Sequence, residues 1–456
     1  MPRETLKSRL GFILLSAGCA IGVGNVWRFP YMVGLYGGGA FVLLYLIFLI
    51  AMGVPVLAME FSVGRASRKS PIMMYQELEP PKSKWHIHGK LSMVGNYILM
   101  MFYTTVAGWM LYYFFKTAKG DFSGLNPGEV RDAFASIKTN LWAQILCMVI
   151  VVMIGFAVCS FSLQKGVERI TKVMMIALLV IMVVLAINSI FLDGGLEGLK
   201  FYLIPDFGRM KSAGILNVIA GAMNQAFFTL SLGIGSMAIF GSYIGKDRAL
   251  LGESINVALL DTFVAFVSGL IIFPACFAYN GGETGSGPSL IFETLPNIFN
   301  HMNGGRIVGA FFFIFMSFAA LSTVFAVFEN IIACTMDLFH CKRTTACLSN
   351  CGLMIFLSLP CILGFNVWAG VHPLGAEKNI MDLEDFLVSN ILLPVGALVF
   401  ILFCTTRYGW GWKNFTEEAN TGKGLKIRKW MRPYMTVVLP FMVLVIFILG
   451  LVQFFK

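Results

Sequence analysis

The stretches Ala17-Gly-Cys-Ala-Ile-Gly-Val-Gly-Asn25 and Phe227-Phe-Thr-Leu-Ser-Leu-Gly-Ile-Gly235 decide how this chain folds. Each places a Gly-x-Gly pair in the middle of a long apolar run, beside hydroxyl, amide or aromatic side chains. Two glycines in one turn destabilise a helix by about 1 kcal/mol each relative to alanine. Close helix packing through small residues is one explanation. It accounts less well for polar neighbours at the same depth in both stretches.

The alternative explanation is that a helix is interrupted at each of these stretches. Unwound backbone at membrane depth is tolerated only where it lines a cavity. Its free N–H groups then face an anion, and its free carbonyl groups coordinate a cation. Such breaks occur at matching places in the two inverted repeats of some carriers. The two stretches therefore predict a binding site between two discontinuous helices, in a repeat of five helices plus five.

The composition places both stretches in a membrane. The chain has 456 residues, of which 57% are apolar and only 13% are charged, against roughly 25% charged in soluble proteins. Such a chain is too poor in charge for a soluble globule and too apolar for disorder. A membrane-spanning helix needs about 20 mostly apolar residues. Eleven spans are predicted, at residues 10–36, 39–62, 92–115, 141–162, 170–191, 213–243, 252–279, 306–338, 347–368, 384–405 and 434–454.

The 34 Lys and Arg residues predict the orientation of these spans. If the N-terminus is cytoplasmic, 23 of them fall in inner segments, 10 fall in outer segments, and Arg28 lies inside a span. Positive charge collects on the cytoplasmic side of membrane proteins. We therefore expect a multi-pass protein of the plasma (cytoplasmic) membrane, with its N-terminus inside and its C-terminus outside. The net charge of +10 is then a sign of topology, and no nucleic-acid partner is expected.

Few ionisable side chains remain for chemistry inside the membrane, where such groups mark function by default. A few that remain in or at the ends of spans are candidates for function: Arg28, Glu60, Asp261, Glu329, Asp337 and Asp385. All five His residues lie in loops or at span edges, and neither an HExxH motif nor paired catalytic carboxylates occur, so an enzyme is not expected. The cluster of Cys341, Cys347, Cys351 and His340 fits no standard zinc spacing.

Five motifs in chain order resemble those of one family. They are Ala17-Gly-Cys-Ala-Ile-Gly-Val-Gly-Asn-Val-Trp-Arg-Phe-Pro30, Gly37-Gly-Gly-Ala-Phe41, Glu60-Phe-Ser-Val-Gly-Arg65, Gln225-Ala-Phe-Phe-Thr-Leu-Ser-Leu-Gly233 and Ser242-Tyr243-x-x-Lys246-Asp247. The chain thus resembles bacterial members of the neurotransmitter:sodium symporter family. The resemblance implies an all-α integral membrane protein in which residues 1–456 form one transporter domain. Its first repeat would be residues 1–192, its second 213–405, and its eleventh helix 434–454.

The resemblance implies sodium-coupled symport of an amino acid by alternating access across the lipid bilayer. It also implies two sodium sites made of oxygen ligands, which suit a hard cation. The first would use the substrate carboxylate, the Ala20 carbonyl and the side chains of Asn25, Thr229 and Asp261. The second would use the carbonyls of Gly18, Ile21 and Ala319 and the hydroxyls of Ser322 and Thr323.

The substrate site implied by the resemblance lies between the broken helices. Backbone amides near Gly22 and Gly24 and the Tyr103 hydroxyl should bind the carboxylate, and carbonyls around Phe228 and Ser231 the ammonium group. Monoamine carriers have Asp at the place of Gly22, so Gly22 favours an amino acid. The side-chain pocket is apolar and favours a hydrophobic or aromatic amino acid. Its expected residues are Val23, Leu99, Tyr103, Phe228, Ser231, Ile234, Thr323 and Val327.

Two gates are implied as well. The outer gate would pair Arg28 with Asp385 over a lid of Tyr103 and Phe228, and the inner gate would pair Arg3 with Asp337, supported by Ser242 and Tyr243. Inserting an Arg such as Arg28 at the centre of a membrane costs at least about 2.5 kcal/mol. This cost favours a functional role for Arg28 over a side chain that merely extends toward the membrane surface.

Residue Asp261 departs from many relatives, which have Asn at this position. Chloride-dependent relatives resemble this chain at Tyr45, Gln225 and Thr229 but have Ser where this chain has Ala265. The hypothesis is that Asp261 supplies the negative charge itself, so that uptake needs no chloride. The alternative function is an amino-acid sensor on the same fold, without transport. A channel is not expected, because no repeated filter sequence is present.

Overall fold

A computed structural model describes residues 5–6, 8–282, 287–375 and 378–454. Within these residues, nine helices are long and apolar enough to cross a membrane. They correspond to nine of the predicted spans, usually with ends a few residues further out. Their bounds are Gly39–Ser67, His86–Lys119, Leu141–Ser160, Gly166–Ile190, Leu250–Tyr279, Gly305–Phe339, Arg343–Leu363, Ile380–Thr405 and Met431–Val452.

The two remaining predicted spans are discontinuous helices, as expected. In the first, Arg9–Ala20 and Gly24–Leu35 meet at an angle of 59°. In the sixth, Ile215–Thr229 (α12) and Ser236–Tyr243 (α13) are separated by residues 230–235. The 15 residues of α12 extend only about 22 Å, less than a hydrocarbon core of about 30 Å. This segment therefore crosses the membrane only as α12 and α13 together.

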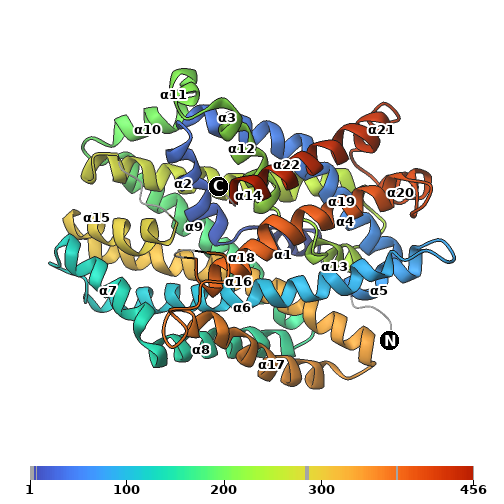
Figure 1. Ribbon diagram of the computed structural model, residues 1–456, viewed down its shortest axis with the longest axis horizontal. Helices are drawn as coiled ribbons and strands as arrows, with labels where there is room; N and C mark the ends of the chain where they lie inside the picture. The colour runs from blue at the N-terminus through green and yellow to red at the C-terminus, as the bar shows by residue number, and fades with distance from the viewer. Residues whose placement is uncertain (1–4, 7, 283–286, 376–377, 455–456) are drawn as a thin grey trace.

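The helices are labelled in Figure 1. Those of the spans are α1 (Arg9–Ala20), η1 (Gly24–Arg28), α2 (Phe29–Leu35), α3 (Gly39–Phe48), η2 (Leu49–Gly53), α4 (Val54–Ser67), α6 (His86–Lys119), α8 (Leu141–Ser160), η3 (Gln164–Glu168), α9 (Arg169–Ile190), α12, α13, α14 (Leu250–Tyr279), α16 (Gly305–Phe339), α17 (Arg343–Leu363), α18 (Ile380–Phe386), η5 (Leu387–Leu392), α19 (Leu393–Thr405), α21 (Met431–Pro433), η6 (Tyr434–Val438) and α22 (Leu439–Phe454). Those of the connections are α5 (Pro71–Leu78), α7 (Pro127–Thr139), α10 (Gly195–Leu203), α11 (Phe207–Ser212), η4 (Leu290–Thr294), α15 (Leu295–His301) and α20 (Trp412–Ala419).

The long helices run side by side, and the connecting helices gather at the two ends of the bundle (Figure 1). Helix α6 packs along α16, α4 along α13, and α14 along α9 and α10. Helices α5 and α20 lie at one end, whereas α7 and α15 lie at the other (Figure 1). The broken helices are thus enclosed by continuous ones, which supply the backbone partners that a break requires.

The break between α12 and α13 depends on backbone conformations that favour glycine. The φ angles of Ser231, Gly233 and Gly235 are 50°, 105° and 72°, in the left-handed region that glycine enters freely. A Cβ atom added at Gly233 would lie 2.2 Å from the Leu393 carbonyl oxygen. The freed N–H group of Gly233 donates to Glu60 Oε1 over 2.5 Å. Glu60, which the sequence left without a mechanism, therefore holds the broken end of the sixth helix.

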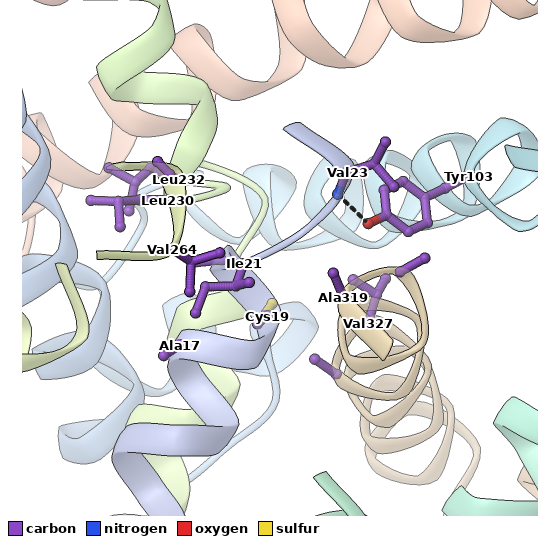
Figure 2. Packing of buried hydrophobic residues seen from close by; sticks show 14 of the residues in the cluster. Ala17, Cys19, Ile21, Val23, Tyr103, Leu230, Leu232, Val264, Ala319 and Val327 are labelled. Atoms are coloured by element: carbon purple, nitrogen blue, oxygen red, sulfur yellow. Dashed lines mark hydrogen bonds between the residues drawn. The ribbon is translucent and has the colours of Figure 1, made fainter. Parts of the chain in front are cut away.

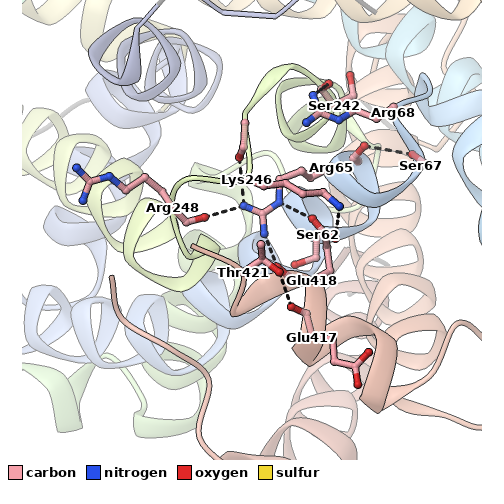
Figure 3. A network of polar contacts seen from close by, with 12 residues as sticks. Ser62, Arg65, Ser67, Arg68, Ser242, Lys246, Arg248, Glu417, Glu418 and Thr421 are labelled. Atoms are coloured by element: carbon pink, nitrogen blue, oxygen red, sulfur yellow. Dashed lines mark hydrogen bonds and ion pairs between the residues drawn. The ribbon is translucent and has the colours of Figure 1, made fainter. Parts of the chain in front are cut away.

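Arg65 is the one arginine whose side chain is fully buried in the described chain, at 0% exposure, with Glu418 of α20 as its partner. Its Nε atom lies 2.5 Å from Glu418 Oε1, and its other nitrogens donate to the carbonyls of Arg248, Gly245 and Glu418 (Figure 3). The sequence placed Arg65 in a loop after a span ending at residue 62, but α4 continues to Ser67. The network fastens α20 to the connection between α13 and α14.

Candidate functional site

The break in the first helix exposes backbone N–H groups to the interior. The Val23 N–H donates to the Tyr103 hydroxyl over 3.2 Å (Figure 2). A Cβ atom added at Gly22 would lie 2.7 Å from that hydroxyl and 3.0 Å from Thr323 Oγ1. Gly22 does not have a positive φ angle. Glycine is needed at this break for space, in contrast to the sixth helix, where it is needed for backbone conformation.

A cavity of about 400 Å³ lies between the two broken helices. The predicted substrate-site residues that line it are Gly22, Val23, Gly24, Leu99, Tyr103, Phe228, Ser231 and Thr323. Two further predicted pocket residues, Ile234 and Val327, are buried but do not line it. The Ile234 carbonyl instead accepts a hydrogen bond from Asn96 over 2.8 Å. The structure thus brings together eight of the ten predicted residues.

The cavity also has wall residues that the sequence did not single out. Among them are Trp27, Tyr31, Phe102, Val106, Met381, Val388 and Leu393. Helical spacing is the signal that could have found some of them. Val106 lies one turn after Tyr103 on α6, and Met381 and Val388 lie one turn to either side of Asp385. These additions make the wall more apolar and aromatic than the predicted set.

Three predicted ligands of the first cation site meet in the buried interior. Asn25 Nδ2 lies 2.8 Å from Asp261 Oδ1, and Thr229 Oγ1 lies 2.8 Å from Asp261 Oδ2. Asn25 Oδ1 accepts from the Gly22 N–H over 3.1 Å. All three side chains are at most 2% exposed. Ala20 and Asn25 also line the cavity, so the cluster borders the substrate space.

The charge of this cluster suits a cation. Within the described residues, no Lys, Arg or His forms an ion pair with Asp261 at the 4.0 Å limit. A buried carboxylate without a positive partner is strongly destabilised. The carboxylate, amide and hydroxyl oxygens present here are the ligand types that hard cations take. The residues therefore fit a sodium ion.

The second predicted cation site surrounds the Thr323 hydroxyl on α16. Carbonyl oxygens of the first helix and of α16 converge on it, and Figure 2 shows the end of α1, with Cys19 and Ile21, beside Ala319 of α16. The distances from Thr323 Oγ1 are 3.2 Å to Ile21, 3.3 Å to Gly18, 3.5 Å to Cys19 and 3.5 Å to Ala319. One hydroxyl proton serves one acceptor at a time, so the set has a surplus of acceptors that fits a cation. Ser322 Oγ donates to the Ala319 carbonyl over 2.9 Å.

The two residues of the predicted outer gate face the same cavity but are not paired. Arg28 and Asp385 both line it. The Arg28 guanidinium carbon lies 4.1 Å from the ring centroid of Phe228, and Asp385 Oδ1 accepts from Ser389 Oγ over 2.7 Å. In the part of the chain that the structure describes, no ion pair within 4.0 Å joins Arg28 to Asp385. The outer end of the cavity, which reaches Gly287 and Pro288, is therefore not closed by this pair.

Of the predicted inner gate, Arg3 lies outside the described residues. Its proposed partner Asp337 accepts a hydrogen bond at Oδ2 from the Ser70 N–H over 2.8 Å. The Ser242 carbonyl accepts from Arg68 over 3.1 Å. Asp337 and Ser242 are thus both held by the short connection between α4 and α5.

The segment before α1 is fastened at the same end of the molecule. The Leu6 N–H donates to the Tyr243 carbonyl over 3.1 Å. The Tyr243 hydroxyl donates to Glu329 Oε1 over 2.7 Å, and Glu329 also forms an ion pair with Arg343. Glu329, which the sequence left without a mechanism, thereby links α16 to the end of α13 and the start of α17. These contacts hold the segment before α1, α13, α16 and α17 together at this end of the molecule.

Comparisons with known proteins agree with this arrangement. The family model of the sodium:neurotransmitter symporter family matches residues 3–124 and 129–456. The chain is 38% identical over 401 residues to YhdH, an uncharacterised sodium-dependent transporter of Bacillus subtilis, covering 87% of this chain and 86% of the relative. It is 31% identical over 461 residues to an uncharacterised sodium-dependent transporter of Haemophilus influenzae, covering 98% of each.

A solved structure shares the fold over its full length. MhsT in complex with L-phenylalanine superimposes with a TM-score of 0.86 and 34% identity, covering 98% of this chain and 100% of that chain. The likeness covers the part of this chain that contains the two broken helices, the cavity between them and the buried oxygen clusters. Together with the family match over nearly the whole chain, this likeness shows that this multi-pass membrane protein is a sodium-dependent transporter, not an enzyme, and belongs to the sodium:neurotransmitter symporter family.

Proposed function

We propose that this protein takes up a hydrophobic amino acid, with an aromatic one such as phenylalanine preferred, by sodium symport with alternating access. The observation that carries the proposal is the cavity of about 400 Å³ between the broken helices. One end holds the unwound backbone at Gly22 to Gly24 and the Tyr103 hydroxyl, which accepts from the Val23 N–H and keeps its own proton to donate to a carboxylate. The rest of the wall is apolar and aromatic. The fold shared with MhsT, which binds L-phenylalanine in its solved complex, supports the same substrate class.

The ammonium group of the substrate would lie against carbonyls around Phe228 and Ser231, where the sixth helix is unwound. The side chain would lie among Leu99, Phe102 and Val106. Most charged groups along the cavity lie toward its outer end, at Arg28, Asp382 and Asp385. Because burying an unpaired charge is costly, charged amino acids should be poor substrates.

Two sodium sites are proposed, one at Asp261 and one at Thr323. Sodium bound at these places would supply the positive charge that the buried oxygen clusters lack. At the first site the Asn25 and Thr229 side chains hold the Asp261 carboxylate in position. At the second, carbonyls of α1 and α16 are held together. Because ligands from α1 and α16 meet there, occupancy would favour the arrangement in which the inner end is closed.

The proposal includes independence from chloride. The Tyr45 hydroxyl and both polar atoms of the Gln225 amide are buried without a hydrogen-bond partner. Tyr45 lies beside Thr229 and within electrostatic reach of Asp261. A buried negative charge is already present at this place, so a chloride ion nearby would be repelled. Ala265 also lacks the hydroxyl that chloride-dependent relatives have at this position, so it offers no donor to a chloride ion.

The proposed orientation has the N-terminus in the cytoplasm and the C-terminus outside. It rests on the distribution of Lys and Arg along the chain. The end that carries α5 and α20 would then be the cytoplasmic end (Figure 1). The two inverted repeats are proposed as residues 1–192 and 213–405, since each begins with its discontinuous helix.

The proposed function predicts sodium-dependent stabilisation by aromatic and large aliphatic amino acids. With purified protein in detergent, phenylalanine at 100 times its Kd should raise the free energy of unfolding by about 2.7 kcal/mol. The rise in Tm should appear in sodium gluconate as fully as in sodium chloride, and should vanish in potassium chloride. Lysine and glutamate serve as controls. If no apolar amino acid raises the Tm in sodium, the pocket is misassigned.

Counterflow in proteoliposomes separates transport from sensing. A transporter exchanges labelled internal phenylalanine for external phenylalanine in the presence of sodium. Sodium-dependent binding without any exchange would instead make the protein an amino-acid sensor on the same fold.

The change Gly22→Ala should abolish substrate binding while leaving the protein folded. The new Cβ atom would lie 2.7 Å from the Tyr103 hydroxyl, in the space proposed for the carboxylate. Overpacking of this kind destabilises a site by about 1–3 kcal/mol, and the loss of the carboxylate contact adds to it. Phenylalanine affinity should fall at least tenfold, measured by the sodium-dependent Tm shift. Gly352→Ala is the matched control, because no atom lies within 4 Å of its Cβ position; equal losses in both variants would contradict the placement.

A further inference from the structure

Glu384 is a buried carboxyl group that the proposed site does not use. It is 4% exposed, and neither of its carboxylate oxygens has a nitrogen or oxygen hydrogen-bond partner in the described chain; only the Cys361 thiol is near enough to interact. Among the described residues, no Lys, Arg or His lies within ion-pair distance of it. An ionised carboxylate in such surroundings is strongly destabilised. The geometry therefore indicates that Glu384 is a neutral, protonated acid in this arrangement of the helices.

The polar groups that face Glu384 from neighbouring helices carry no charge. The Cys361 thiol of α17 is its polar neighbour, and the Thr105 hydroxyl of α6 lies beside the same thiol. Both side chains are at most 1% exposed, and the Thr105 hydroxyl also lacks a partner. The charged groups on α18 itself are Asp382 and Asp385, which are acidic. The surroundings thus form a small cluster of polar side chains between α6, α17 and α18, and within the described residues no cation pairs with Glu384 there.

Lys378 and Arg28 are cations that interact electrostatically with acids of α18 other than Glu384. Lys378 precedes the helix and acts on Asp382. Arg28 faces the cavity beside Phe228 and acts on Asp385. The proton on Glu384 is therefore not displaced by a fixed positive charge in this arrangement.

The position of Glu384 couples it to the outer gate. Met381, Asp382, Asp385 and Val388 line the cavity, and consecutive helical residues are about 100° apart around the axis. Glu384 therefore faces away from the cavity while sharing one turn with the gate residue Asp385. Any movement of α18 that brings Asp385 to Arg28 must move Glu384 within this cluster. The π-helical segment η5 directly follows this turn, and π-bulges are frequent at functional sites.

We propose that Glu384 is a proton-binding site linked to the outer gate. The carboxyl group holds a proton while the gate is open, and releases it to a water molecule when the movement of α18 that brings Asp385 toward Arg28 opens the surroundings of Glu384. The O–H bond breaks, its electron pair remains on the carboxylate, and water accepts the proton. Release is favoured because Arg28 brings a positive charge to the turn that carries Glu384. The inference rests on the proposed function for the closing of this gate by substrate.

The test measures protons released when phenylalanine is added to the purified protein in weakly buffered sodium gluconate with a pH-indicator dye. Sodium is saturating beforehand, so that any proton displaced by sodium is already lost. Over a pH series, wild-type protein should release up to about one proton more per bound phenylalanine than Glu384→Gln. Asp132→Asn, at an exposed acid on α7 outside the site, should release as much as wild type. Equal release by wild type and Glu384→Gln, with binding intact in both, overturns the inference and leaves the proposed function standing.

A second variant keeps the carboxyl group and changes its neighbour. Cys361→Ser replaces a weak thiol donor by a stronger hydroxyl donor, which favours the charged carboxylate. The midpoint of proton release should therefore move to lower pH. An unchanged midpoint would contradict the contact between Cys361 and Glu384. This measurement can be made even if Glu384→Gln does not fold. Absence of sodium-dependent phenylalanine binding in the wild type would reject the proposed function instead.

Discussion

Replacing Asp261 with Asn is expected to weaken sodium-dependent phenylalanine binding in chloride-free buffer by at least about 100-fold. Asp261 is fully buried, and its carboxylate is held by Asn25 and Thr229. In the proposed site the Asp261 carboxylate pairs with a sodium ion. Removing one partner of a buried charge pair costs about 3–5 kcal/mol, and each 1.4 kcal/mol corresponds to about tenfold in affinity. The measurement is the sodium dependence of the phenylalanine-induced Tm shift in sodium gluconate. Asp132→Asn, at an exposed acid on α7, is the matched control.

A second substitution tests why Asp261 is needed. In the double variant Asp261→Asn with Ala265→Ser, a hydroxyl joins Tyr45 and Gln225, whose polar atoms lack partners. Chloride should then restore binding, because an external anion replaces the missing charge. Chloride should have little effect on the wild type. The hypothesis is contradicted if wild-type binding requires chloride, or if Asp261→Asn binds as well as wild type without it.

Replacing Arg65 with Ala is expected to destabilise the protein by about 3–5 kcal/mol, because it removes the buried partner of a largely buried carboxylate and leaves only the exposed Lys246 beside it. Arg65 is 0% exposed and Glu418 is 11% exposed. The guanidinium also satisfies carbonyls of Arg248 and Gly245, which would lose their donors. The effect should appear as a markedly lower Tm in detergent, with α20 becoming accessible to protease before the spanning helices.

Lys246→Ala is the matched control for this change, since Lys246 pairs with the same Glu418. That contact is 3.5 Å long, and the lysine side chain is 60% exposed. Exposed pairs contribute about 0–1 kcal/mol, so the Tm should hardly change. If Lys246→Ala and Arg65→Ala lower the Tm equally, burial is not what makes the Arg65 network strong.

Much of the site was predictable because its chemistry is unusual for a membrane. Asp261 and Arg28 were noticeable in the sequence, since an ionisable residue in a span is rare. The Gly-x-Gly pairs marked both breaks. Side chains without such a signal were missed or misplaced. Phe102 and Val106 look like ordinary lipid-facing residues, and Ile234 and Val327 were assigned to a wall that they do not line.

The amino-acid sequence alone determined that the chain is a helical membrane protein broken in its first and sixth spans. Hydropathy, charge and glycine content act locally along the chain, so they can be read without knowing which helices are neighbours. The tertiary structure decided what each group contacts. It buries Arg65 against Glu418 and leaves Glu384 without a nitrogen or oxygen partner among the described residues. It also shows that Gly22 is required for space and Gly233 for its φ angle of 105°. Burial and partners depend on residues far apart in sequence, and only the packed helices bring those together.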